Sequence, residues 1–90
     1  MFTLTNNARE HICRILADYD GRVVLRISRG PEGLQIVTGR VLIGDTTFTA
    51  LGRTILAVDQ MTMQSLGGHM LDTAVVDGQT VLELVKRETI

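Results

Sequence analysis

The sequence has 90 residues, a formal net charge of −1 and 44% apolar residues, which suits one small domain over residues 1–90 and excludes two. No apolar stretch approaches the roughly 20 residues of a membrane span, and no basic segment leads into an apolar one at the N-terminus. Nine basic residues are balanced by ten acidic ones, and aromatic residues make up 3%. We therefore expect a cytoplasmic protein with neither a membrane nor a nucleic acid as its partner.

The first elements in the chain are predicted to be a short strand and an amphipathic helix. Phe2–Leu4 favours the strand, and either Thr5 or Asn7 can cap the helix that follows. Glu10 lies three residues after Asn7, where a capping box would place it. Asp18, Asp20 and Gly21 are expected to end the helix. One apolar face is expected from residues at helical spacing: Ala8, Ile12, Ile15, Leu16 and Tyr19.

From residue 22 onward the pattern indicates strands. Val23–Ser28 is rich in β-branched residues and alternates between apolar and polar positions. Arg29–Gly33 is predicted to be a loop, because two glycines and the only proline of the chain fall together there. Leu34–Ile43 is predicted to be extended, with Gly39 as a bulge or bend, and a turn follows at Gly44-Asp45.

The rest of the chain predicts two hairpins and a short helix between them. The paired strands are Thr46–Ala50 with Thr54–Val58, and Met70–Val76 with Thr80–Val85. Leu51–Arg53 and Asp77-Gly78 form the turns, and Asp59 caps a helix over Gln60–Leu66 that ends at Gly67-Gly68. Seven strands and two helices predict a mostly β (α+β) domain, with mixed sheets in a partly open barrel or sandwich.

Short stretches along nearly the whole chain carry a family resemblance. They are Phe2–Ala8, Val24–Ser28, Gly30–Gln35, Leu56–Asp59, Ser65–Gly68 and Leu71-Asp72. In this order they resemble the HesB/IscA-like A-type iron–sulfur cluster carrier and assembly family, and Gly30–Gln35 is similar to its Gly-Cys-Ser-Gly-Leu-Gln loop. The resemblance implies a HesB-like compact β domain with an N-terminal helix and one short helix, and an iron–sulfur cluster as cofactor.

The ligand cysteines that the resemblance implies do not carry over to this sequence. One lies in the family's loop, where Pro31 stands here, and two lie in a C-terminal Cys-Gly-Cys tail. We expect no such tail, because the sequence ends at Lys86–Ile90, about where the last strand should finish. We therefore predict no catalytic, cofactor-binding or metal-binding residue and no cofactor, since a cluster is held by thiolates.

The remaining soft ligands each have an ordinary structural role as an alternative to metal binding. Cys13 is the only cysteine, and it is either a redox or cluster thiol or a small, partly buried apolar residue, which is the role we predict. His11 and His69 lack an evident partner for metal binding or proton transfer, so we predict surface or satisfied histidines.

Two further groups have both a binding and a structural interpretation. Met61 and Met63 either form an adaptable binding surface or fill gaps in a core that is poor in aromatic residues, and the second is predicted. Arg22, Arg26 and Arg29 either line one edge of the first long strand as a basic stripe, or form a solvated face or a guard on an edge strand, and the structural role is again the prediction.

The loop formed by Gly30, Pro31, Glu32 and Gly33 is the candidate site of contact with a protein partner, through an exposed Glu32; the alternative is a plain turn. The leading hypothesis is a non-enzymatic scaffold or protein-interaction module, a relative of the carriers with a degenerate site, that forms a homodimer. The alternatives are a cluster or iron carrier that uses Cys13 or ligands borrowed from a partner or glutathione, and an enzyme with a cryptic site, which nothing in the sequence supports.

Overall fold

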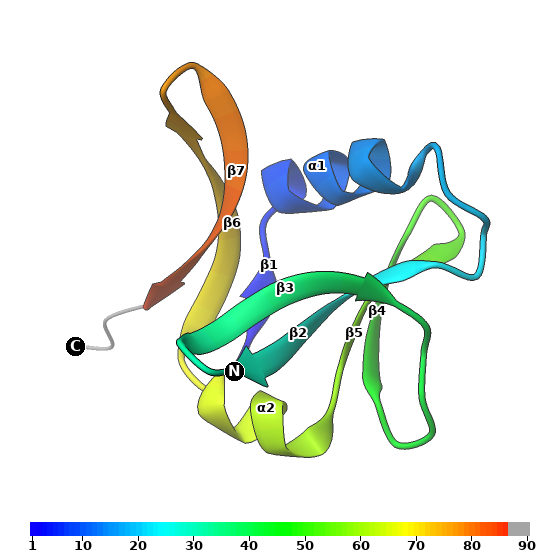
Figure 1. Ribbon diagram of the computed structural model, residues 1–90, viewed down its shortest axis with the longest axis vertical. Coiled ribbons are helices and arrows are strands. Elements are labelled where there is room, and N and C mark those ends of the chain that lie inside the picture. Colours follow the sequence, from blue (N-terminus) through cyan, green and yellow to red (C-terminus); the bar gives the residue numbers. More distant parts are fainter. Residues whose placement is uncertain (87–90) are drawn as a thin grey trace.

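The computed structural model describes residues 1–86 and contains seven strands and two helices there (Figure 1). In chain order they are β1 (Thr3–Leu4), α1 (Asn6–Leu16), β2 (Val24–Gly30), β3 (Gly33–Gly39), β4 (Thr46–Ala50), β5 (Arg53–Val58), α2 (Gln60–Ser65), β6 (His69–Val76) and β7 (Gln79–Lys86). Every predicted strand and helix is present in order. The expectation about a C-terminal tail falls on residues 87–90, outside the described part. Neither helix is long and apolar enough to cross a membrane.

The strands form two mixed sheets that do not close into a barrel. One sheet has the order β1-β6-β7 and the other β3-β2-β5-β4. Strand β1 runs parallel to β6, and β2 runs parallel to β5, whereas the hairpin partners are antiparallel. In Figure 1, α1 and α2 lie at opposite ends of the four-stranded sheet. The predicted mostly β class with mixed sheets is confirmed.

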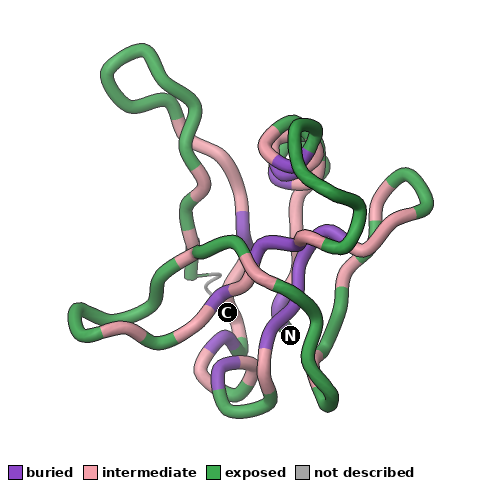
Figure 2. The backbone as a smooth tube through the Cα atoms, turned by 45° about the vertical axis from the view of Figure 1, so that its right-hand side comes forward, coloured by how far each residue is buried: buried purple, intermediate pink, exposed green. Residues whose placement is uncertain are grey.

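The hydrophobic core lies where the two sheets and α1 meet. Ile12 and Leu16 of α1 and Ile27 of β2 are completely buried. The ring of Phe2 packs edge-to-face on Phe48 with centroids 5.5 Å apart, which connects the N-terminal segment to β4. Figure 2 shows the buried residues converging at the centre of the molecule, while the hairpin tips are exposed.

The helix α1 begins at a cap with two functions. The Ala8 N–H donates to Thr5 Oγ1 at 3.1 Å, and the Thr5 hydroxyl itself donates to Asp72 Oδ1 at 2.7 Å. The cap therefore also fastens α1 to β6. The alternative cap at Asn7, with Glu10 completing a capping box, is wrong because both residues lie inside the helix.

The C-terminal end of α1 differs from the prediction. The helix ends at Leu16, and the Tyr19 N–H donates to the Leu16 carbonyl at 3.0 Å in the turn that follows. Tyr19 consequently leaves the apolar face of the helix and is 48% exposed. The sequence spacing suggested a longer helix because it could not show where the backbone turns away.

The predicted loop between the first two long strands is a tight turn. Gly30 pairs with Gly33, so that only Pro31 and Glu32 lie between β2 and β3. Two residues are the shortest common connection of a β-hairpin. The five-residue loop predicted over residues 29–33 is therefore wrong: the glycines continue the strands rather than interrupt them.

Strand β3 is shorter than predicted, and Gly39 is its last residue rather than a bulge. Gly39 pairs in regular register with Val24. A Cβ atom at Gly39 would lie 2.8 Å from Cδ of Arg26, so the glycine leaves room for that side chain. Residues 40–45 then form a loop, which is held by Arg26 as described below.

Candidate functional site

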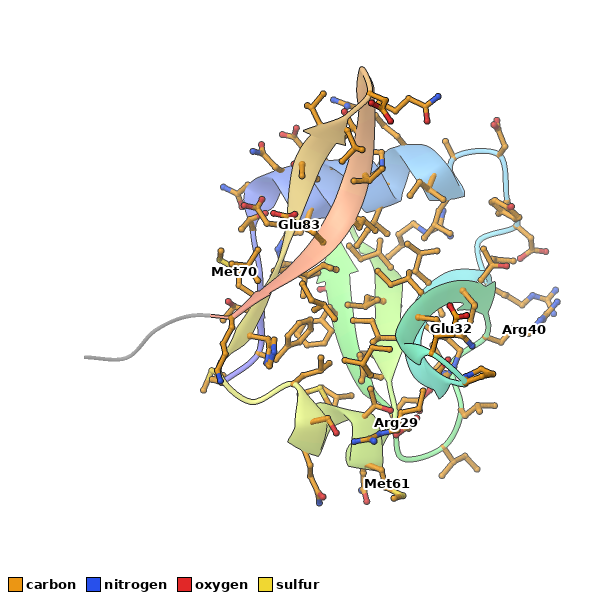
Figure 3. The ribbon with its side chains drawn as sticks, turned by 60° about the vertical axis from the view of Figure 1, so that its left-hand side comes forward. Arg29, Glu32, Arg40, Met61, Met70 and Glu83 are labelled. Atoms are coloured by element: carbon orange, nitrogen blue, oxygen red, sulfur yellow. The ribbon has the colours of Figure 1, made fainter. Side chains whose placement is uncertain are left out.

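The β2–β3 turn contains the residues that the sequence singled out for partner contact. Pro31 and Glu32 are exposed at its tip, and Gly33 has a φ of 118°, a conformation that favours glycine. Figure 3 shows Glu32 on this hairpin, away from the core. The predicted exposure of Glu32 is confirmed, and its contact with a partner stays a prediction.

Side chains hold both sides of this turn in place. The Gln35 side chain lies over Gly30, where a Cβ atom would come within 2.6 Å of Gln35 Oε1. Gln35 Nε2 is 3.5 Å from Ser28 Oγ, and the Arg29 guanidinium donates to Ser65 Oγ at the end of α2. The turn is therefore a fixed, exposed projection, and both serine hydroxyls are engaged in structural contacts.

A groove of about 570 Å³ lies beside the end of β2 that leads into this turn, between the 40–45 loop and the start of α2. Ile43 and Met61 line it, and Met61 is 75% exposed. Figure 3 shows Arg29 and Met61 at this end of the molecule. Met63 instead packs against the core. The prediction that both methionines fill the core is thus confirmed for Met63 and wrong for Met61.

A partly buried ion pair fixes the loop that forms one wall of the groove. The Arg26 guanidinium donates to both carboxylate oxygens of Asp45, with Nη2 3.2 Å from Oδ1. Arg26 Nη1 also donates to the Arg40 carbonyl at 2.9 Å, and the Leu42 N–H donates to Asp45 Oδ2 at 2.7 Å. The two side chains are only 12% and 3% exposed. The pair therefore ties the 40–45 loop to the middle of β2.

The hydrogen bonds of this pair shift the pKa values of both groups. Hydrogen bonding to Asp45 raises the pKa of Arg26 above its ordinary value, against the effect of burial. Hydrogen bonding from Arg26 lowers the pKa of Asp45, with the Leu42 N–H acting in the same direction. Patterns in the sequence do not reveal this pair. Its only signal was a charged residue in the middle of an otherwise apolar alternating strand.

The three arginines do not form a basic stripe. Arg26 and Arg29 have odd spacing on one strand, so their side chains lie on opposite faces. Arg22 precedes β2, and its Nε atom is 3.9 Å from Asp20 Oδ1. The predicted solvated face is wrong for Arg26, because its side chain is partly buried against Asp45.

Acidic pH is expected to destabilise the protein through Asp45 and Asp59. The N–H and hydroxyl of Thr62 donate to Asp59, at 2.7 and 3.0 Å, and lower its pKa, as Arg26 does for Asp45. A carboxyl with a lowered pKa in the folded state binds fewer protons there than in the unfolded state. The stability it contributes is therefore present above the ordinary pKa of 3.8 and is lost as the pH falls through the folded value.

Urea unfolding at pH 7 and at pH 3 checks this prediction. The midpoint should fall at pH 3, and Asp45→Asn should reduce the difference between the two pH values by removing one of the titrating groups. Equal midpoints for the wild type at the two pH values would contradict it.

The chain's thiol and its two histidines lie elsewhere. Cys13 is partly buried on α1 against the core, as predicted, and α1 lies apart from the β2–β3 turn in Figures 1 and 3. His11 is on the same helix, and His69 Nδ1 is 3.2 Å from the Gly67 carbonyl. Across residues 1–86, no three His, Cys, Asp or Glu side chains gather to hold a metal ion.

The residues of the turn do not fit an iron–sulfur cluster. Iron in such a cluster is held by thiolates, whereas the turn presents the ring of Pro31 and the carboxylate of Glu32. A carboxylate is a hard ligand and a poor substitute for a thiolate in this chemistry. The chain's one cysteine is on a different element.

The two mixed sheets and the order of their elements are those of a HesB/IscA-like fold, as the sequence resemblance implied. Escherichia coli SufA, which is involved in the biosynthesis of iron–sulfur clusters, superposes with a TM-score of 0.77 and 22% identity, over 94% of this chain and 84% of SufA. IscA with a 2Fe–2S cluster gives a TM-score of 0.64 and 14% identity, over 96% of this chain and 85% of IscA. Neither a family model nor a curated protein matches the sequence. At these identities the likeness establishes the fold.

Proposed function

We propose that this chain is a non-enzymatic domain that does not bind an iron–sulfur cluster with its own residues and acts as a scaffold or protein-interaction module. The fold that it shares with SufA and IscA supports a role in iron–sulfur cluster assembly. The observation that carries the proposal is the composition of the β2–β3 turn: Pro31 stands where the family resemblance implies a ligand cysteine, and Glu32 follows it. The single thiol, Cys13, is on α1.

The shape of the turn supports the interaction role. Exposed turns on a rigid scaffold are common sites of recognition, and this one is braced by the contact of Arg29 with Ser65. Its tip carries the charge of Glu32 next to a proline, which restricts the backbone. Such a turn offers a partner a carboxylate at low cost in conformational entropy.

Co-purification tests the contribution of Glu32. Tagged wild type should recover a specific partner protein that Glu32→Ala loses. Glu83→Ala is the matched control, because Glu83 is also exposed but lies on the β6–β7 hairpin (Figure 3). An unchanged set of recovered proteins with Glu32→Ala would remove Glu32 from the proposal.

The second candidate function is a carrier of a cluster or of iron that uses Cys13 or ligands from a partner or glutathione. Its support is that Cys13 is only partly buried and lines a shallow hollow together with Arg9 and Glu10. Two copies of the chain would offer two such thiols. Iron uptake in the presence of glutathione that Cys13→Ser abolishes would favour this function over the scaffold.

The proposal places the protein in the cytoplasm, without a nucleic acid or a membrane as its partner. A net charge of −1 gives no electrostatic footprint for a nucleic acid.

A further inference from the structure

Strand β3 is an edge strand without the usual protection against pairing with another chain. It has seven residues, and its sequence from Gly33 to Gly39 contains neither a charged residue nor a proline. Leu34 and Val37 are 39% and 40% exposed. In Figure 1 neither helix lies across it. Edge strands usually carry charges, prolines or bulges, or are covered, because their open backbone groups recruit further strands.

The other sheet edges within residues 1–86 are protected. Strand β1 has only two residues. Strand β4 is interrupted by a register shift between Phe48 and Thr49, and the Thr49 carbonyl already accepts from Arg9 Nη1 at 2.6 Å. Strand β7 carries Glu83 and Lys86. Among the sheet edges within residues 1–86, β3 is therefore the one whose backbone groups are left unprotected against pairing with another strand.

The register of the hairpin shows which backbone groups of β3 are open. Gly30 and Gly33 flank the two-residue turn, so they exchange both of their hydrogen bonds. Because the pattern alternates along an antiparallel pair, the N–H and C=O groups of Leu34, Ile36 and Thr38 point away from β2. These groups are available to a further strand.

The charges that flank β3 are complementary to those of a second copy. Glu32 precedes the strand and Arg40 follows it, and both are exposed. Ile36 is midway between them. If Ile36 faces Ile36 of a second copy in an antiparallel pair, each Glu32 comes opposite an Arg40. The same register places Leu34 opposite Thr38, which aligns the open backbone groups of both strands.

We propose that the protein forms a two-fold symmetric dimer in which β3 pairs antiparallel with β3 of a second copy, and Glu32 of each copy pairs with Arg40 of the other. The interface is isologous, as two-fold symmetry requires, and joins the two four-stranded sheets into one. The bond from Arg26 Nη1 to the Arg40 carbonyl fixes the backbone at one end, and the Arg29–Ser65 contact braces the other.

This dimer extends the proposed function. It rests on that function in one respect: it names a second copy of the chain as the partner of the β2–β3 hairpin. Its failure is distinguishable from failure of the scaffold role. A monomeric protein would overturn the dimer but would say nothing about cluster binding. Uptake of a cluster would overturn the scaffold role whatever the oligomeric state.

Sedimentation velocity over about 5 to 500 µM tests the dimer, since small interfaces dissociate in this range. Glu32→Arg and Arg40→Glu should each raise the dissociation constant about tenfold, because each variant creates two like-charge contacts. The double variant Glu32→Arg/Arg40→Glu restores opposite charges and should return to within about threefold of wild type. The control Glu83→Arg makes the same charge change on β7 and should have no effect.

Thr38→Pro tests the backbone pairing separately. Proline removes the N–H that points away from β2 and is tolerated at an open strand edge, so the variant should be monomeric with an unchanged circular dichroism spectrum. If Thr38→Pro fails to fold, the charge-reversal variants of Glu32 and Arg40 still test the dimer. Any one of three results would overturn the proposal. The wild type stays monomeric at every concentration, neither single charge reversal weakens the dimer, or the double variant dimerises as weakly as the single variants.

Discussion

Asp45→Ala should lower the free energy of unfolding by about 2 kcal/mol, because it leaves the Arg26 guanidinium, whose side chain is only 12% exposed, without its counter-ion. It also removes the acceptor of the Leu42 N–H, so that the 40–45 loop loses its attachment to β2. Urea denaturation followed by circular dichroism measures the change. The large effect is expected from the burial of the pair, since exposed ion pairs contribute little.

Two comparisons isolate the contribution of the Arg26–Asp45 pair to the free energy of unfolding. Glu10→Ala breaks an exposed contact with Arg14 whose side chains are 68% and 75% exposed, and it should change stability by less than about 0.5 kcal/mol. Arg26→Met/Asp45→Ala removes both charges and should be more stable than Asp45→Ala alone. If Asp45→Ala costs no more than Glu10→Ala, the partly buried pair does not hold the loop.

Ile27→Ala should be destabilising by about 2 to 4 kcal/mol. Ile27 is completely buried in the middle of β2, where it pairs with Ile36 on one side and Val58 on the other. Truncation would leave a cavity at the centre of the four-stranded sheet. Urea denaturation followed by circular dichroism measures this loss of stability.

Val75→Ala serves as the control for Ile27→Ala, because Val75 is 74% exposed on β6. It should change the free energy of unfolding by less than about 0.5 kcal/mol. Similar costs for the two substitutions would mean that the core is not centred on β2.

Local signals in the sequence were sufficient to predict the individual elements. Asp77 and Gly78 both have positive φ values, 51° and 78°, as their hairpin turn requires, and Asp59 caps α2 with its carboxylate. The order of strands in the sheets was not available from such signals. The parallel pairing of β2 with β5 joins strands separated by β3 and β4, and depends on packing across the whole domain.

The candidate site was predicted less completely. The exposed position of Glu32 followed from the glycines and proline around it, but the same glycines suggested a longer loop than the two-residue turn. The Arg26–Asp45 pair was missed because it joins a strand to a loop 19 residues away, and only the path of the loop brings the two together. The proposed pairing of Glu32 with Arg40 of a second copy depends on the register of β3, which the sequence does not show.

We propose that this HesB/IscA-like fold does not bind a cluster with its own residues. Anaerobic reconstitution with ferrous iron and sulfide, followed by desalting, an absorption spectrum and a count of iron and sulfide per chain, tests it most directly. Wild type, Cys13→Ser and IscA as the positive control are treated together. We expect wild type and Cys13→Ser to remain colourless and without iron or sulfide, whereas IscA takes up its cluster. Stoichiometric uptake by the wild type, abolished in Cys13→Ser, would contradict the account and identify Cys13 as a cluster ligand.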